Sequence, residues 1–164
     1  MVEMCAELGR GCGSSAWVFS NLAGQSTIVG THSPRAQDEV WADNPGNLVA
    51  SSYPTGGGTA RRVEGGIVVN GLYSFASGVD FAQWENLQVF IPNEGRAPDH
   101  RFALVPKSDY TIKDDWFSTG LSGTGSRSVV LDNVFIPEYR LLDVTKVGHP
   151  EDPVVDFHPN PLYR

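Results

Sequence analysis

The hydrophobic pattern of this chain changes its period near residue 46, and that change restricts the folds open to it. Segment 14–31 carries apolar residues nearly all round, as in a helix that is buried on several sides. Ser33 followed by proline predicts the start of a second helix over 34–42, and the turn-forming run 43–46 predicts its end. After Leu48 only short extended runs follow, so the sequence predicts helices first and strands afterwards.

The extended runs have strand composition and are separated by turn signals at the spacing of a small barrel or sandwich. They lie at 48–52, 60–64, 67–70, 86–91, 101–105, 110–116 and 128–136, with hairpin turns predicted at 64–66 and 92–95. We therefore predict an α+β chain with an antiparallel β-barrel. Its expected parts are 1–46, the end of a helical domain; 47–144, the β-barrel; and 145–164, a polar, proline-rich linker.

Composition excludes several classes of function. The formal net charge of -7 argues against non-specific nucleic-acid binding, which needs a basic surface. No apolar run approaches the roughly 18 residues of a membrane span. Cys5 and Cys12, about 10 Å apart on one helix, are too far apart for a disulfide. We therefore expect reduced thiols and a cytoplasmic protein.

The run GLYSFASGVDFAQW at 71–84 has an unusual composition for a strand. A strand that only fills a core normally carries Val, Ile and Leu, whereas this run offers Phe75, Ser77 and Gly78. Positions 75 and 77 share one face of an extended strand. A flat ring beside a hydroxyl is what a planar ring cofactor needs from the wall of its site.

Three other segments contain candidate site residues. The run LVASSYPTGGGT contains Ser51 and Ser52 before a glycine-rich loop, and Trp17 and Gln25 lie eight residues apart, near one helical face. The glycine-rich loop at 122–126 precedes a strand, so it lacks the helix N-terminus of a phosphate-binding loop. We identify no catalytic nucleophile and base, and no histidine or cysteine spacing that indicates a metal site.

Together these segments resemble the middle β-barrel domain of the acyl-CoA dehydrogenase superfamily. The runs ELGRGCGSSAW, QDEVWAD, SFASG, GLSGTGS and NPLYR are most similar to its reduced-flavin-dependent aromatic monooxygenases, such as the oxygenase components acting on 4-hydroxyphenylacetate. The resemblance covers nearly the whole chain. It implies a fragment of a longer protein, from which the C-terminal four-helix bundle of the family is missing.

The resemblance also implies roles for single residues. The aromatic ring at 75 would lie along the flavin and the hydroxyl at 77 near its N5 atom. The serines at 51 and 52 would meet the flavin pyrimidine edge or the substrate. Gln25 stands where phenol-hydroxylating relatives often carry a histidine, which weakens the expectation of a simple phenol. The expected cofactor-binding residues are Ser51, Ser52, Phe75, Ser77 and Gly78, and the expected substrate-binding residues are Trp17, Gln25 and Ser51.

The expected function is that of the oxygenase component of a two-component monooxygenase. A separate flavin reductase would supply reduced FMN or FAD, and the protein, expected to be a homotetramer at full length, would hydroxylate a small aromatic substrate with dioxygen. One alternative is an FAD-dependent acyl-CoA dehydrogenase, since the same fold serves it. The other is a non-catalytic β-barrel binding module, if the protein has only 164 residues.

Overall fold

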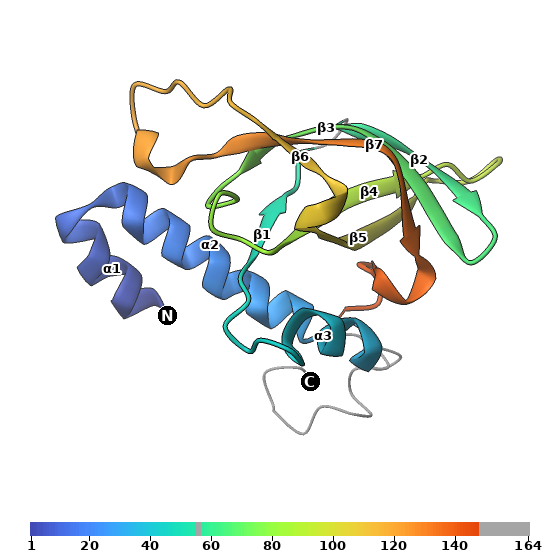
Figure 1. The fold of residues 1–164 in the computed structure, drawn as a ribbon, viewed down its shortest axis with the longest axis horizontal. Helices are drawn as coiled ribbons and strands as arrows, with labels where there is room; N and C mark the ends of the chain where they lie inside the picture. The colour runs from blue at the N-terminus through green and yellow to red at the C-terminus, as the bar shows by residue number, and fades with distance from the viewer. Residues whose placement is uncertain (55–56, 148–164) are drawn as a thin grey trace.

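A computed structural model describes residues 1–54 and 57–147 of the chain, and its helices come first (Figure 1). The predicted second helix is confirmed. The Ser33 hydroxyl accepts a hydrogen bond from the Ala36 amide at 3.3 Å, and Pro34 occupies the first turn. The helices are α1 (Val2–Gly11), α2 (Gly13–Val29) and α3 (Pro34–Trp41).

The strands form two four-stranded sheets, ordered β1-β4-β5-β8 and β2-β3-β7-β6. Their bounds are β1 (Val49–Ser52), β2 (Gly58–Val63), β3 (Gly66–Ala76), β4 (Trp84–Ile91), β5 (Asp99–Pro106), β6 (Thr111–Lys113), β7 (Arg127–Pro137) and β8 (Leu141–Asp143). Short 3₁₀ turns occupy η1 (Lys107–Asp109), η2 (Ser122–Thr124) and η3 (Glu138–Arg140). The predicted hairpin turn at Gly65 is confirmed, with φ of 77° between β2 and β3.

The α+β prediction is confirmed, but the strands of the described residues form two sheets in place of a closed barrel. Three of the four edge strands, β1, β6 and β8, have only three or four residues, and no pairing among the described residues joins an edge of one sheet to an edge of the other. One pairing is also parallel: β1 runs alongside β4, with Ser51 opposite Asn86. All other strand pairs are antiparallel, as predicted.

The main hydrophobic core lies between the two sheets. Leu87, Val89 and Ile91 alternate along β4 and are all buried, which is the pattern of a strand with one face on a core. They pack with inward residues of the other strands, among them Ile67, Val69, Ala103, Val105, Val129, Leu131 and Ile136. A smaller cluster joins the helices to the outer face of the first sheet, formed by Val29, Ala36, Val40, Val49, Trp84 and Leu104.

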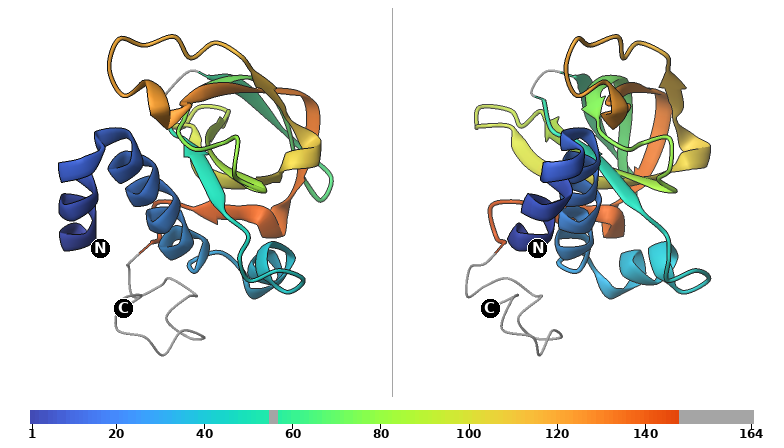
Figure 2. Two further views of the ribbon diagram at one scale, coloured as in Figure 1. Left: turned by 60° about the vertical axis from the view of Figure 1, so that its left-hand side comes forward. Right: turned by 90° about the vertical axis from the view of Figure 1, so that its left-hand side faces the viewer.

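Helix α2 lies beside the strands, and α1 folds back against α2 (Figure 2). The chain reverses at Cys12, whose extended backbone has φ of -156°. The apolar composition of α2 predicts burial on several sides, yet only Gln25 and Val29 of this helix are buried. The strands cover one side of α2 and α1 covers another, and its remaining surface is open in the described structure.

Three smaller findings complete the fold. Cys5 and Cys12 are free thiols, and Cys12 is exposed. Within residues 1–54 and 57–147, no helix combines the length and the apolar character needed to cross a membrane. The linker predicted at 145–164 lies almost entirely outside the described residues.

Candidate functional site

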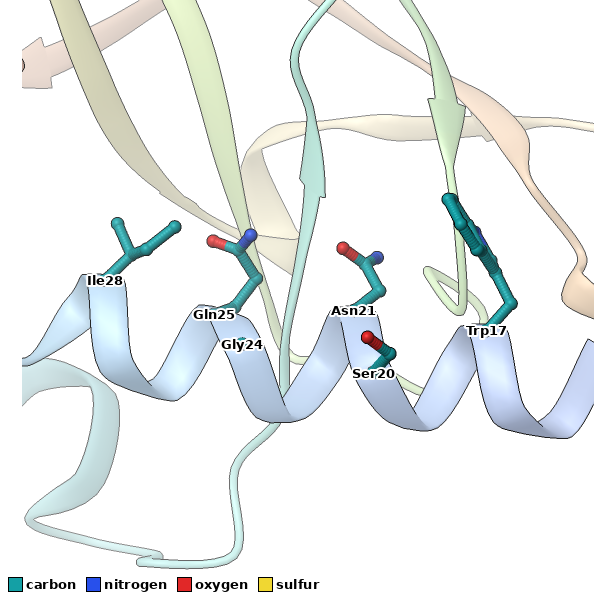
Figure 3. Close-up of a pocket in the computed structure, with 6 residues that line it drawn as sticks. All are labelled: Trp17, Ser20, Asn21, Gly24, Gln25 and Ile28. Carbon is teal, nitrogen blue, oxygen red and sulfur yellow. The ribbon is translucent and has the colours of Figure 1, made fainter. Parts of the chain in front are cut away.

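One face of α2 carries a row of polar and aromatic side chains that point toward the strands. Trp17, Asn21 and Gln25 follow one another at intervals of four residues, so they lie along one side of the helix. Figure 3 shows them rising from α2 together with Ile28. A pocket of about 250 Å³ runs along this row, lined by Trp17, Ser20, Asn21, Gly24, Gln25 and Ile28.

The first two members of the row bind the strands by hydrogen bonds. The Trp17 indole Nε1 donates to the Ser77 hydroxyl at 3.0 Å, and the Asn21 amide Nδ2 donates to the Ser77 carbonyl at 2.9 Å. The Asn21 carbonyl accepts from the Ser51 hydroxyl at 3.0 Å. Asn21 therefore ties α2 both to β1 and to the turn after β3.

The third member, Gln25, is 4% exposed and accepts two hydrogen bonds at its carbonyl oxygen. The Tyr53 hydroxyl donates to it at 2.8 Å and the Asn86 amide at 3.0 Å. The Tyr53 ring stacks on Phe102 with centroids 4.6 Å apart. Burial raises the pKa of Tyr53 to about 12, so its hydroxyl keeps its proton near neutral pH.

We call this row and its partners the polar seam. It comprises Trp17, Asn21, Gln25, Ser51, Tyr53, Ser77 and Asn86. No member carries a charge near neutral pH, and the pocket along it is lined by uncharged side chains only. Such a site suits a neutral, flat molecule that needs a few directed hydrogen bonds.

Behind Ser77 a chain of buried hydroxyl groups leads into the glycine-rich loop. The Ser77 and Ser126 hydroxyls lie 2.7 Å apart, and those of Ser126 and Thr124 lie 2.6 Å apart. Thr124 then donates to the Leu121 carbonyl at 2.9 Å. Gly125, with φ of 52°, permits the turn that returns the loop to Ser77. This chain fixes where the Ser77 hydroxyl lies.

Phe75 has a strained backbone and an exposed ring. Its φ of 64° is uncommon for a residue other than glycine, and such strain often marks functional sites. The ring is 60% exposed and meets Trp116 edge to face, with centroids 6.1 Å apart. It borders a second pocket of about 190 Å³, lined by Ser74, Phe75, Asp115, Trp116, Ser126 and Ser128.

The conformation of Phe75 also overturns the simple alternation expected at 75 and 77. The β3–β7 pairing is irregular between Tyr73 and Ala76, and β3 ends at Ala76, so Ser77 lies in the following turn. Phe75 is exposed, whereas Ser77 is buried against α2 and Ser126. Phe75 thus borders the second pocket, whereas the Ser77 hydroxyl lies buried between Trp17, which lines the first pocket, and Ser126, which lines the second.

Two expected cofactor residues have other contacts. The Ser52 hydroxyl donates to the Ser74 carbonyl at 2.6 Å, so it binds β3 instead of the polar seam. Gly78 has φ of 80°, and a β-carbon there would lie 3.0 Å from the Val18 side chain. Glycine at 78 is therefore needed both for the turn and for the close approach of α2.

The structure brings Trp17, Gln25, Ser51 and Ser77 together in one seam, with Phe75 close by and Ser52 facing elsewhere. Sequence reasoning missed Asn21, Tyr53 and Asn86. The eight-residue spacing from Trp17 to Gln25, which is two intervals of four, could have identified Asn21, which lies midway. No sequence signal pointed to Asn86, because it reaches the site through the parallel pairing of β1 with β4. In the described part of the chain, no three His, Cys, Asp or Glu residues form a possible metal site.

Comparison with known proteins gives consistent matches, although no protein-family model matches the chain. The flavin-dependent monooxygenase oxygenase subunit HsaA of Mycobacterium tuberculosis is 40% identical over 141 residues, covering 85% of this chain and 35% of that protein. The FADH₂-dependent resorcinol hydroxylase oxygenase component of Rhizobium sp. is 37% identical over 143 residues, covering 87% of this chain and 35% of that protein.

A solved structure agrees with these relatives. The crystal structure of 3-HSA hydroxylase from Rhodococcus sp. RHA1 superimposes with a TM-score of 0.87 at 35% identity, covering 93% of this chain and 40% of that one. The chain therefore spans about a third of the length of the curated relatives it matches.

Proposed function

Since the chain is homologous to a segment of the oxygenase components of flavin-dependent aromatic monooxygenases, with an acyl-CoA dehydrogenase-like fold, we propose that its protein hydroxylates an aromatic substrate with reduced flavin and dioxygen. The observation that carries this proposal is the junction at Ser77. Its hydroxyl is held by Trp17 and Ser126, two residues after the strained, exposed Phe75.

The residues at this junction fit a flavin. The exposed Phe75 ring offers a surface for a flat ring system, and Ser77 offers a hydroxyl at a fixed position for a ring nitrogen. Ser126 and Thr124 hold that hydroxyl in place. Reduced FMN or FAD, when bound, supplies the electrons that activate dioxygen. The protein supplies orientation, hydrogen bonds and exclusion of water.

The pocket along α2 is the proposed place for the aromatic substrate. Trp17 offers an indole surface at one end and Gln25 a polar contact farther along. Ser51 holds Asn21, which lines the pocket between them. Trp17, Gln25 and Ser51 are the substrate-binding residues of the proposal, and Ser51, Phe75, Ser77 and Gly78 are its cofactor-binding residues, with Ser52 acting through β3. The monooxygenase relatives favour hydroxylation over the dehydrogenation of an acyl-CoA, and over a role as a binding module.

Partners, location and domain division belong to the same proposal. The relatives are named as oxygenase subunits or components, which supports a separate reductase that delivers the reduced flavin. We further propose a homotetrameric full-length protein in the cytoplasm. Its helical segment 1–46 and its strand domain 47–144 meet at the polar seam, and 145–164 links them to the rest of the protein.

Oxygen transfer in the intact protein tests this function. Anaerobically reduced FMN or FAD is mixed with the protein and a panel of phenols, and isotopically labelled dioxygen is then admitted. We expect labelled oxygen in a hydroxylated product. Ser77→Ala should lower the product formed per flavin oxidised, because the hydroxyl that orients the ring is gone. Ser108→Ala, which removes an exposed hydroxyl bonded to Asp109, is the matched control. Absence of labelled product with every phenol and both flavins would contradict the proposal.

A further inference from the structure

We propose that Gln25 presents its amide N–H group to the pocket, and that Tyr53 and Asn86 are the positioning residues that hold it this way. The substrate group facing Gln25 is then a hydrogen-bond acceptor, such as a carbonyl or phenolate oxygen on the aromatic ring. That the ligand carries an aromatic ring rests on the proposed function. The orientation of the Gln25 amide follows from its own contacts.

The carbonyl side of Gln25 is fully used. An amide oxygen has two lone pairs, and here they accept from the Tyr53 hydroxyl at 2.8 Å and from Asn86 Nδ2 at 3.0 Å. Tyr53 is a dependable donor because it stays protonated near neutral pH. A ligand in the pocket would therefore find no free acceptor on Gln25.

Asn86 is held by its donor side. It is completely buried, and its Nδ2 contacts both Gln25 and the Tyr53 hydroxyl, the latter at 3.3 Å. Its backbone sits in a central strand, opposite Ser51 on one side and Leu104 on the other. Its carbonyl oxygen is buried without a partner among the described residues. Asn86 is thus fixed to donate toward Gln25.

The amide nitrogen of Gln25 is what remains for the pocket. Gln25 lines that pocket, and its Nε2 makes no hydrogen bond to the described residues. This nitrogen is also absent from the set of buried atoms that lack a partner, so it is open to a ligand. Figure 3 shows the Gln25 side chain rising with Asn21 and Trp17 toward the strands. Gln25 thus offers a neutral donor at its end of the pocket, which selects for an acceptor atom on the ligand there. The Ser20 hydroxyl, which can donate or accept, lines the same pocket beside Asn21.

Binding of matched ring compounds to the intact protein tests this inference. Acetophenone carries an acceptor, aniline carries chiefly a donor, and ethylbenzene carries neither. One hydrogen bond of about 1.4 kcal/mol corresponds to about tenfold in affinity. Calorimetry on the wild-type protein should show acetophenone binding about tenfold tighter than ethylbenzene, and aniline no tighter than ethylbenzene. Equal affinities for acetophenone and aniline would overturn the inference.

Asn86→Asp should reverse this preference. The measurement is made at a pH above the pKa of the new aspartate, which burial raises. A carboxylate at 86 then accepts where the amide donated, so Gln25 turns its N–H group toward it and its carbonyl toward the pocket. Aniline should then bind about tenfold tighter than acetophenone. The control is Gln88→Glu, which adds the same charge two residues along the same face of β4 and should keep the wild-type preference. An Asn86→Asp protein that still prefers acetophenone would overturn the assigned role of Asn86.

A second variant and a separate flavin-binding measurement distinguish failure of this inference from failure of the proposed function. If Asn86→Asp does not fold, Tyr53→Phe takes its place, and the acetophenone preference should shrink because one of the two donors that orient Gln25 is lost. An unchanged preference would count against the role of Tyr53. The compounds are also measured without flavin, and reduced-flavin binding is measured separately. Loss of flavin binding would count against the proposed function, whereas the ring preference alone decides the orientation of Gln25.

Discussion

Asn86 and Leu87 are neighbours on β4, both are completely buried, and they face two regions of opposite character. Leu87 points into the interior between the sheets, where apolar side chains pack without directional contacts. Asn86 points into the polar seam, where the buried side chains are joined by hydrogen bonds of defined geometry. Burial alone therefore does not distinguish core from site in this fold. What distinguishes them is whether the buried side chain has to fill space or has to form hydrogen bonds of defined geometry.

The two regions should respond differently to mutation. The interior depends on filled volume, so a truncation costs stability wherever it is made. The polar seam depends on matched donors and acceptors, so a change that keeps the volume but loses the pairing should matter there.

The largest stability effect is expected from Leu87→Ala in the interior. Removing a fully buried leucine leaves a cavity, and the free energy of unfolding should fall by about 2–5 kcal/mol. Urea denaturation of the intact protein measures it. The preference for acetophenone over aniline should remain, because Gln25 and Asn86 keep their contacts. A loss below about 1 kcal/mol would mean that the sheet interior is loosely packed.

Asn21→Leu keeps the number and branching of the side-chain heavy atoms but removes pairing from the polar seam. The Ser51 hydroxyl and the Ser77 carbonyl each lose a partner, which should lower the free energy of unfolding by about 1–3 kcal/mol. Asn21→Ser, which keeps a polar group, is the matched variant and should lose less. Chemical denaturation compares them. If Asn21→Leu were neutral or stabilising, the stability of the polar seam would not depend on hydrogen-bond pairing, and the seam would behave like the interior.

Glu85 is the exception within the interior, because it is a completely buried carboxyl group without a partner among the described residues. Burial raises its pKa well above the ordinary 4.5. The folded state therefore keeps a proton that the unfolded chain releases above pH 4.5. Stability should consequently fall as the pH rises from there toward the folded-state pKa.

Glu85→Gln should remove that pH dependence. The difference in unfolding free energy between Glu85→Gln and wild type should grow with pH by up to about 1.4 kcal/mol per unit above pH 4.5. Urea titrations at a series of pH values measure it, and Glu94→Gln in the exposed turn after β4 is the control. A constant difference across this range would show that Glu85 ionises normally in the folded protein.

The smallest effect is expected from Arg62→Met, which lies outside both regions. Arg62 pairs with Asp99 and Glu138, but its side chain is 48% exposed. Surface ion pairs contribute little, so the change should cost less than about 1 kcal/mol and diminish further in high salt. Thermal unfolding at two salt concentrations checks it. A cost comparable to that of Leu87→Ala would break the proposed ranking.

Much of the scaffold was predictable because it depends on local pattern. The proline and serine at the start of α3 and the alternation along β4 fixed those elements to within about two residues. Strand β3 runs on to Ala76, beyond the predicted end at Asn70, because Gly71, with φ of 146°, lets the strand continue through an irregularity.

The site was only partly predictable because it depends on pairing across the chain. The spacing of Trp17 and Gln25 placed both on one helical face, and the structure bears out that placement. Asn86 enters the seam because β1 pairs in parallel with β4 and sets Ser51 opposite it. That pairing joins residues far apart in sequence and leaves no periodic signal. The left-handed backbone of Phe75 could not be predicted from the sequence either, since most residues with that conformation are glycine or asparagine.

Anaerobic titration of the intact protein with reduced flavin measures whether the junction of Phe75 with the polar seam holds the cofactor. We expect saturable binding that Ser77→Ala and Phe75→Ala each weaken by about fivefold or more, the effect of one lost contact of about 1 kcal/mol. Ser108→Ala should bind as wild type does. Unchanged affinity in both site variants would place the flavin elsewhere in the protein.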